Sequence, residues 1–326
     1  MQVGKYQQKL KTGYPMQTRR KFIEQGALTV GAMIASNSVL ASVAGREESK
    51  ILTILHTNDV HSRLEPFPMD GSKNQGLGGV AARAELINKI RAEQEHVLLL
   101  DAGDIFQGTP FFNIYKGEPE IKAMTAMKYD AATMGNHDFD DGLEDFAAQL
   151  KHADFPIIIA NYDFTGTVME GKYLPYKIFK KGKLKIGVTG VGVELNGLVS
   201  DINYGNTKYL DPVSSANAIA HKLKLDENCD MVICLSHLGF KYSTNKVSDE
   251  VLARQSEHID LIIGGHSHTF FDTPLIYKNK SGNDVIVNQV GWAGIVLGRL
   301  DFEFSKNKKK NLVKSHTVVI GEKASE

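Results

Sequence analysis

The sequence predicts an α/β fold, and three observations support that prediction. Short apolar runs recur along most of the chain, helical patterns separate several of them, and polar residues directly follow many of the runs. Continuous apolar runs are typical of strands that are covered on both faces. Alternation of such strands with helices is typical of an α/β domain, in which ligands bind at the carboxyl ends of the strands.

Eight apolar runs are expected to form strands. In chain order they are residues 51–56, 97–100, 131–134, 156–160, 183–191, 231–235, 261–263 and 285–290. Two hairpins are also expected. Residues 176–191 would turn at Lys181-Gly182, and residues 297–320 would turn through residues 305–311.

Four segments show a helical pattern of apolar residues between these runs. They are residues 79–93, 117–127, 143–152 and 212–223. The segment that begins near Leu143 carries acidic residues in its first turn, which favours a helix because they complement its dipole. The chain shows no internal repeat and no linker rich in Pro or Ser, so we expect residues 45–326 to form one compact domain.

Residues 1–44 are expected to be an export signal. Arg19 and Arg20 lie in a twin-arginine pattern that is followed by a weakly apolar stretch. Polar residues at 36–38 interrupt this stretch, which argues against the alternative of an uncleaved membrane anchor. Small residues predict cleavage after Ala44, and Met16 is a candidate for the true start. We therefore expect a periplasmic or secreted protein without a permanent membrane anchor.

Charge and cysteine content exclude two further classes. Residues 45–326 hold 32 basic and 37 acidic side chains, which gives a formal charge of −5. A nucleic-acid binder normally carries a basic face, so we expect no nucleic-acid polymer as a partner. Cys229 and Cys234 are expected to remain free thiols, because a disulfide across so short a segment would need unfavourable geometry.

Polar residues at the ends of the expected strands are the main functional signal. They are Asp59 and His61, Asp104, Asn136 with His137 and Asp140, His237, and His266 with His268. Carboxylate, carboxamide and imidazole groups without cysteine favour Mn, Fe, Zn, Co or Mg over a thiolate zinc site. Two such ions can clamp a phosphoryl group and hold an attacking hydroxide, provided that one carboxylate bridges them. Asp104 is the natural bridging residue, because it ends the second strand beside Gly103.

The order of these motifs resembles the calcineurin-like metallophosphoesterase superfamily. The motifs are Asp-x-His at 59–61, Gly-Asp-x-x-Gln-Gly at 103–108, Gly-Asn-His-Asp at 135–138, Ser-His at 236–237 and Gly-His-x-His at 265–268. The Gln-Gly and the Phe-Asp at 139–140 narrow the resemblance to the 5′-nucleotidase / 2′,3′-cyclic phosphodiesterase / UDP-sugar hydrolase family, from about residue 51 to about residue 304. The resemblance implies a metallophosphoesterase sandwich of two mixed β-sheets flanked by helices.

The resemblance also implies a role for each residue of the set. The first ion would be held by Asp59, His61 and His268, the second by Asn136, His237 and His266, and both by the bridging Asp104. His137 would act on the leaving oxygen, and Asp140 would orient that imidazole. The implied reaction is hydrolysis of a phosphate ester of a nucleotide, by in-line attack of the hydroxide that bridges the ions.

Several neighbouring residues are expected to have structural roles. His56 is expected to be packed rather than to bind metal, Gln107 to shape its loop, and Trp292 to lie in the core or at a rim. Asp101 would orient its loop or a ligand. Asn161 could reach the metal ligands, but a role as a cap at the end of a strand is an equal alternative.

The sequence departs from two-domain relatives at its end. Those relatives carry a second domain with base-stacking aromatic residues, and no segment here can be assigned to it. Either a separate C-terminal-domain protein completes a split enzyme, or the single domain accepts small phosphoesters unaided. Two further functions stay open: a thiosulfohydrolase-like enzyme, and a non-catalytic binding subunit stabilised by metal.

Overall fold

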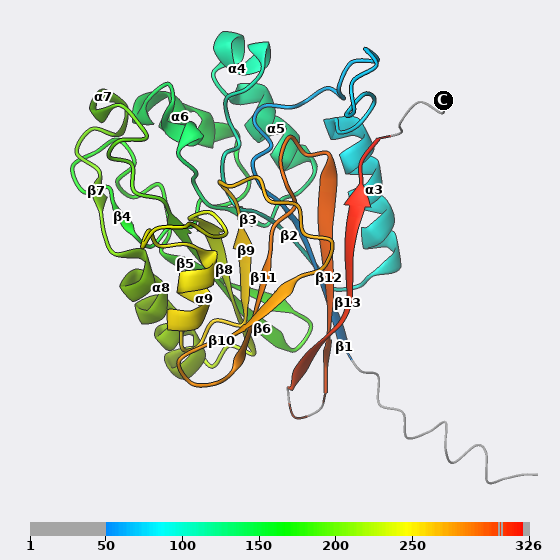
Figure 1. Ribbon diagram of the computed structural model, residues 1–326, viewed down its shortest axis with the longest axis vertical. Coiled ribbons are helices and arrows are strands. Elements are labelled where there is room, and N and C mark those ends of the chain that lie inside the picture. Colours follow the sequence, from blue (N-terminus) through cyan, green and yellow to red (C-terminus); the bar gives the residue numbers. More distant parts are fainter. Residues whose placement is uncertain (1–49, 306, 308, 322–326) are drawn as a thin grey trace, which may run out of the picture. The chain divides into compact units, whose positions relative to one another are not determined.

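Two mixed β-sheets form the centre of the computed structural model, which describes residues 50–305, 307 and 309–321 (Figure 1). The expected export signal at residues 1–44 lies outside the described residues. The first sheet has five strands in the order β13-β12-β1-β2-β3. Their bounds are β1 Lys50–Thr57, β2 Val97–Asp101, β3 Ala131–Ala132, β12 Val296–Phe304 and β13 Lys310–Val319. Strands β1, β2 and β3 are parallel, whereas β12 and β13 join antiparallel.

The second sheet has six strands in the order β10-β11-β9-β8-β6-β5. Their bounds are β5 Tyr176–Lys181, β6 Leu184–Gly192, β8 Met231–His237, β9 Leu261–Gly264, β10 Leu275–Lys278 and β11 Asp284–Asn288. The four central strands are parallel, and the edge strands β5 and β10 pair antiparallel. A separate ladder of two short strands joins β4, Tyr162–Asp163, to β7, Lys208–Tyr209.

Helices cover the outer face of each sheet. Their bounds are α3 Val80–Glu93, α4 Pro110–Tyr115, α5 Glu118–Ala126, α6 Leu143–Gln149, α7 Asp201–Tyr204, α8 Pro212–His221 and α9 Asp249–Gln255. Shorter helical turns lie between them: η1 His137–Phe139, η2 Leu150–His152 and the π-helical η3 Lys222–Asp226. Apolar residues of α3, α5 and α6 pack on the first sheet, and those of α8 and α9 pack on the second. Among the described residues, no helix is both long enough and apolar enough to span a bilayer.

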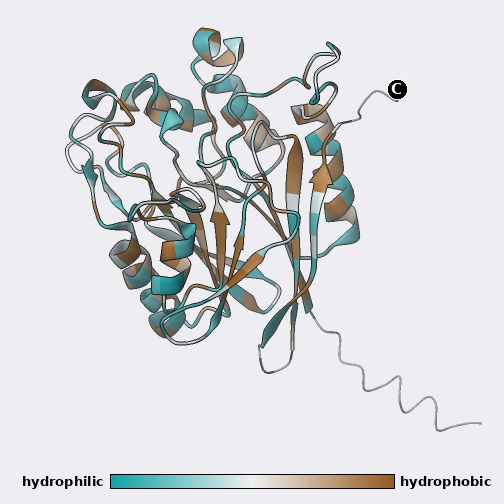
Figure 2. Cartoon of the chain, in the orientation of Figure 1, coloured by the Kyte–Doolittle hydropathy of each residue, from teal (hydrophilic) through white to brown (hydrophobic). Residues whose placement is uncertain are grey.

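Side chains alternate between the two faces of each strand, and this alternation divides the core into three layers. Leu98 and Leu100 of β2 point between the two sheets, whereas Leu99 points outward to the helices. Strand β8 repeats the pattern, with Ile233 between the sheets and Cys234 under the helices. Successive side chains of a strand point to opposite faces, so strands covered on both sides must be apolar throughout. Figure 2 shows the result, with hydrophobic residues concentrated on the strands and hydrophilic residues on the outer helices and loops.

The observed fold is the expected α/β sandwich of two mixed sheets, and both expected hairpins form. The strand expected at residues 156–160 was wrong. Ile158 donates to Ala132 of the first sheet, whereas Ile159 donates to Leu174, and Ala160 donates to Gly190 of the second sheet. Because its donors alternate between partners, this segment makes isolated bridges instead of a continuous ladder. Both cysteines are free and buried, as expected.

Candidate metal centre

The loops that follow β1, β2, β8 and β9 meet at the carboxyl ends of these parallel strands. Five of the predicted ligands have left-handed backbone angles: Asp59, His61, Asp104, His266 and His268, with φ between 50° and 71°. Such angles are uncommon outside glycine and persist only where the surroundings hold them. Hydrogen bonds between loops supply that support. The amide of Asp59 donates to the Gly103 carbonyl at 2.9 Å, and that of His61 donates to the Asp104 carbonyl at 3.1 Å.

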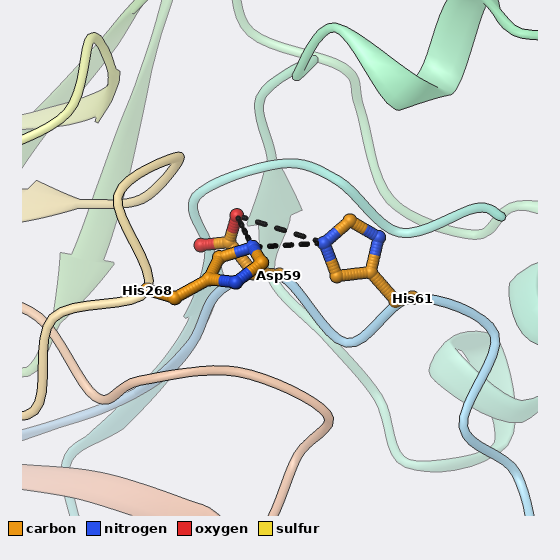
Figure 3. Close-up of side chains that lie close together, drawn as sticks. All are labelled: Asp59, His61 and His268. Carbon is orange, nitrogen blue, oxygen red and sulfur yellow. Dashed lines mark hydrogen bonds and ion pairs between the residues drawn. The ribbon is translucent and has the colours of Figure 1, made fainter. Parts of the chain in front are cut away.

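Asp59, His61 and His268 form the first candidate metal-binding triad. Figure 3 shows their side chains pointing toward one another, two from the loop after β1 and one from the loop after β9. The Nε2 atoms of the two imidazoles are 3.1 Å apart, and Nε2 of His268 is 3.3 Å from Oδ1 of Asp59. Asp59 is fully buried, whereas the His268 side chain is 41% exposed, so the triad opens on one side.

Asp104, His237 and His266 form the second candidate triad. Nε2 of His237 lies 3.0 Å from Oδ2 of Asp104. Asn136 joins this group, because its Oδ1 lies 2.7 Å from Nδ1 of His266. Each member of this set comes from a different strand end, so the set exists only in the folded chain.

The Asp104 carboxylate faces both triads. Its Oδ2 lies 3.8 Å from Nε2 of His61 in the first triad and 3.0 Å from Nε2 of His237 in the second. Its Oδ1 accepts a hydrogen bond from the backbone amide of His137 at 2.8 Å. A single buried carboxylate is thus fixed between two clusters of ligand atoms, which is the position that a bridging ligand needs.

Burial and nearby carboxylates set the protonation of the histidines in different directions. Burial lowers the pKa of His61 and lowers that of His266 to about 3, so both are neutral near pH 7, the form that binds metal. Burial opposes the charged form of His237, but the Asp104 carboxylate outweighs it and raises the pKa of His237 to about 10. Nδ1 of His237 lies 2.7 Å from the Ala102 carbonyl, which leaves Nε2 facing Asp104. Nε2 of His237 is therefore ion-paired with the Asp104 carboxylate, 3.0 Å from its Oδ2.

His137 and Asp140 form a pair at the open side of the centre. Nδ1 of His137 lies 2.8 Å from Oδ2 of Asp140, and this hydrogen bond is the main cause that raises the pKa of His137. The His137 ring meets the His61 ring edge-on, with centroids 5.2 Å apart. The pair is therefore beside the first triad, partly exposed, and biased toward the protonated imidazole.

Asp138 and Asp101 fix the loop that carries Asp104. The Asp138 carboxylate accepts hydrogen bonds from four backbone amides, those of Asp104, Ile105, Phe106 and Gly135, at 2.8–3.1 Å. Asp101 accepts from the Gly103 amide at 2.9 Å and from Thr57 Oγ1 at 2.5 Å. Asp101 was expected to orient its loop or a ligand, and these two contacts are to its own loop and to Thr57.

Two glycines allow the loops to approach one another this closely. A side chain at Gly135 would overlap with Oδ1 of Asp104, although its own backbone has no positive φ. A Cβ at Gly265 would lie 2.8 Å from Nδ1 of His237 and 3.1 Å from Oδ2 of Asp59. The glycines in these motifs are therefore required by packing against the ligands.

Two positioning residues were not predicted from the sequence. Asn58 donates to Oδ2 of Asp59 at 2.6 Å and accepts from the amide of Val290 at 3.0 Å. Gln289 binds the 265–269 loop, through the Gly265 carbonyl and the amide of Thr269, both at 2.5 Å. Gln289 follows β11 directly, so the rule that polar residues follow parallel strands could have found it.

Three other residues that the sequence analysis discussed belong to neither triad. His56 is fully buried, lies 2.8 Å from the Asn288 amide nitrogen through its Nε2, and belongs to neither triad. Asn161 bonds both the amide and the carbonyl of Gly192, the last residue of β6, so its side chain is committed to the backbone. Trp292 lies at the rim, where its ring stacks on His268 at 5.9 Å and 11°.

A cleft of about 210 Å³ opens beside the first triad. Its lining includes His61, His137 and His268 together with Arg63, Gln107 and Trp292. The side chains of His61, His137 and His268 therefore face a space that solvent and a small molecule can enter.

Comparison with known proteins shows which family the chain resembles. A family model described as calcineurin-like phosphoesterase matches residues 52–270. The chain is 38% identical over 299 residues to a snake venom 5′-nucleotidase of Crotalus adamanteus, covering 85% of this chain and 48% of that protein. It is 36% identical over 305 residues to a 5′-nucleotidase of Homo sapiens, covering 87% of this chain and 51% of that protein.

Solved structures show the same likeness in three dimensions. The crystal structure of a 5′-nucleotidase precursor from Thermus thermophilus matches with a TM-score of 0.76 and 33% identity, over 83% of this chain and 55% of that one. The chain thus spans about half the length of the curated relatives it matches.

Proposed function

Because this chain belongs to the calcineurin-like phosphoesterase family, we propose that it is a two-metal hydrolase acting on phosphate esters of nucleotides. The observation that carries the proposal is the position of Asp104, whose Oδ2 lies 3.8 Å from His61 and 3.0 Å from His237. A buried carboxylate is costly unless positive charge or hydrogen-bond donors compensate it, and a carboxylate placed between two clusters of ligand atoms fits a pair of cations.

The donor set fits two divalent ions. Asp59, His61 and His268 would hold the first ion, Asn136, His237 and His266 the second, and Asp104 both. The set offers carboxylate, carboxamide and imidazole atoms and no thiolate, which suits Mn, Fe, Co, Zn or Mg. When bound, two such ions supply an activated water and neutralise charge on the phosphoryl oxygens.

His137 would act on the leaving group. Its imidazole lines the cleft, and its hydrogen bond to Asp140 raises its pKa and so favours the protonated form. A protonated imidazole can donate its proton to the departing oxygen, which is otherwise a poor leaving group. Asp140 would hold Nδ1, so that Nε2 is the atom left to deliver the proton.

Nucleotides are the proposed substrates because the curated relatives are described as 5′-nucleotidases. We further propose that the chain acts outside the cytoplasm after twin-arginine export, on the basis of the pattern at Arg19 and Arg20. In a second proposed arrangement the reaction is the same, but the enzyme consists of two proteins. This chain would supply the catalytic domain, and a separate protein would supply the base-binding domain. The relatives' greater length motivates this alternative.

Phosphate release by the purified chain, reloaded with Mn²⁺, tests the proposal. The substrates are AMP, UDP-glucose, 2′,3′-cyclic AMP and bis-p-nitrophenyl phosphate. Efficient turnover of AMP supports a nucleotidase that needs no partner, whereas turnover of the artificial diester alone supports the divided enzyme. Absence of hydrolysis of all four substrates by metal-loaded chain would contradict the proposed function.

A further inference from the structure

A second cavity adjoins the cleft at the metal centre. It has a volume of about 350 Å³, and its lining includes Arg63, Thr109, Pro110, Phe111, Ile114 and Tyr115. Most of these residues belong to α4 and the residue before it. Its volume lies within the range of about 300–1,000 Å³ that is typical of small-molecule sites.

Arg63 is the residue that the two spaces share, since it lines both the cleft with the histidines and the second cavity. Its guanidinium carbon lies 4.2 Å from the centroid of the Phe67 ring, and among the described residues it makes no ion pair within 4 Å. Its Nε is buried without a hydrogen-bond partner among the described residues. A cation that no carboxylate contacts directly thus lies between the two spaces.

Helix α4 is tied firmly to the metal centre. Thr109, which precedes the helix, donates from Oγ1 to the carbonyl of Ser62 at 2.8 Å. A Cβ at Gly108 would lie 3.0 Å from the His61 carbonyl, so the two loops are in close contact. The second cavity therefore has a defined position next to His61.

The second cavity presents aromatic surface that is not otherwise used. The rings of Phe111 and Tyr115 stack with centroids 6.4 Å apart and planes at 28°. Ile114 is 67% exposed and Tyr115 is 53% exposed, so one short helix presents a group of large side chains to solvent, which often marks a binding site. Aromatic faces beside a guanidinium are suited to a planar heterocycle that carries an anionic group.

We propose that this second cavity is a base subsite: the nucleobase of the substrate packs against Phe111, Ile114 and Tyr115, while Arg63 contacts the segment that leads to the phosphate at the triads. The inference rests on the proposed function and specifies its substrate class, a phosphoester whose leaving group carries an aromatic base. It also gives this chain a base-binding surface of its own, within residues that the sequence did not single out.

Calorimetry with adenosine tests the subsite without any need for turnover. Adenosine is expected to bind the full chain, with ribose as the reference ligand that lacks a base. Tyr115→Ala is expected to weaken adenosine binding about tenfold, because stacking of a base on an aromatic ring typically contributes about 1–3 kcal/mol. A matched pair controls for apolar surface: Ile114→Ala should weaken binding, and Ile202→Ala, which removes an 85% exposed isoleucine on α7, should not.

Kinetics supply the second measurement. The ratio of kcat/KM for AMP to kcat/KM for ribose 5-phosphate is expected to exceed one and to fall about tenfold in Tyr115→Ala, with no change in Ile202→Ala. Failure to bind adenosine, or equal binding by Tyr115→Ala and the unmodified chain, overturns the base subsite. Hydrolysis of ribose 5-phosphate would then still support the proposed function. Conversely, base-dependent binding without hydrolysis of any phosphoester would overturn the proposed function and leave the subsite supported.

Discussion

At the scale of single residues, His137 is the side chain whose role is most specific. If it protonates the leaving oxygen, His137→Ala should lower kcat for AMP by about 10²–10⁴-fold, the usual contribution of general acid catalysis. The loss should be much smaller with p-nitrophenyl phosphate, because nitrophenolate leaves without a proton. Steady-state rates with both substrates measure the difference. Equal losses on the two substrates would show that His137 does not act on the leaving group.

Asp140 should set the pH at which His137 works. The hydrogen bond from His137 to Asp140 raises the pKa of His137, so the protonated form persists to higher pH than in a free imidazole. Activity that needs this proton is present below that pKa and is lost as pH rises through it. Asp140→Asn should therefore move the alkaline limb of the kcat profile for AMP to lower pH. An alkaline limb that stays in place would contradict the proposed pairing.

The residues of the two candidate triads could be located from the sequence more readily than the residues that support them. Asp59, Asp104 and His237 could be predicted because each lies at or just after the end of an apolar strand, and parallel strands end at one edge. Asn58 and Arg63 could not, because their roles depend on partners more than 200 residues away or on the shape of a cavity. A sequence pattern indicates where strands end, but it does not indicate which side chains meet across the two sheets.

At the scale of elements, the turn after β3 must pass against the Asp104 carboxylate. Gly135→Ala would place a methyl group on Oδ1 of Asp104, so it should displace the carboxylate and abolish high-affinity metal binding and hydrolysis. Gly166→Ala is the control, since it meets no atom within 4 Å and has a φ of +74°. That control should cost stability by only about 1–2 kcal/mol and should retain activity. Metal titration of the two variants decides the matter, and full metal binding by Gly135→Ala would contradict the packing argument.

Strands could be predicted where a segment pairs with neighbours in one sheet. They were predicted wrongly where the hydrogen bonds of a segment alternate between two sheets. Strand β8 is flanked by parallel strands on both sides, so its apolar run was unambiguous. Residues 156–160 are equally apolar, yet their hydrogen bonds go to two different sheets and no strand forms. Helix α9 was missed because it is short, although Ser248 caps it by accepting from the amide of Val251 at 3.4 Å. Apolar content shows that a segment is buried, but not which ladder it joins.

At the scale of the whole described unit, the proposed metal centre should hold the two sheets together. The proposed ligands come from the loops after β1, β2 and β3 of the first sheet, from the last residue of β8 and from the loop after β9 of the second sheet. Ions that bind only the folded chain stabilise it by about 2.7 kcal/mol per site at a hundredfold excess over Kd. EDTA should therefore lower Tm by several degrees, and Mn²⁺ should restore it. Calorimetric scans of the same sample test this, and a Tm that is indifferent to both reagents would contradict ion binding across the sheets.

The measurement that tests the central claim most directly is phosphate release by Asp104→Ala, compared with the unmodified chain at equal Mn²⁺. Asp104 faces both triads, so its loss should remove tight metal binding at both of them. The variant should therefore hydrolyse neither AMP nor bis-p-nitrophenyl phosphate. Circular dichroism should confirm that the variant stays folded. Undiminished phosphate release by folded Asp104→Ala would contradict a shared two-metal centre at these residues.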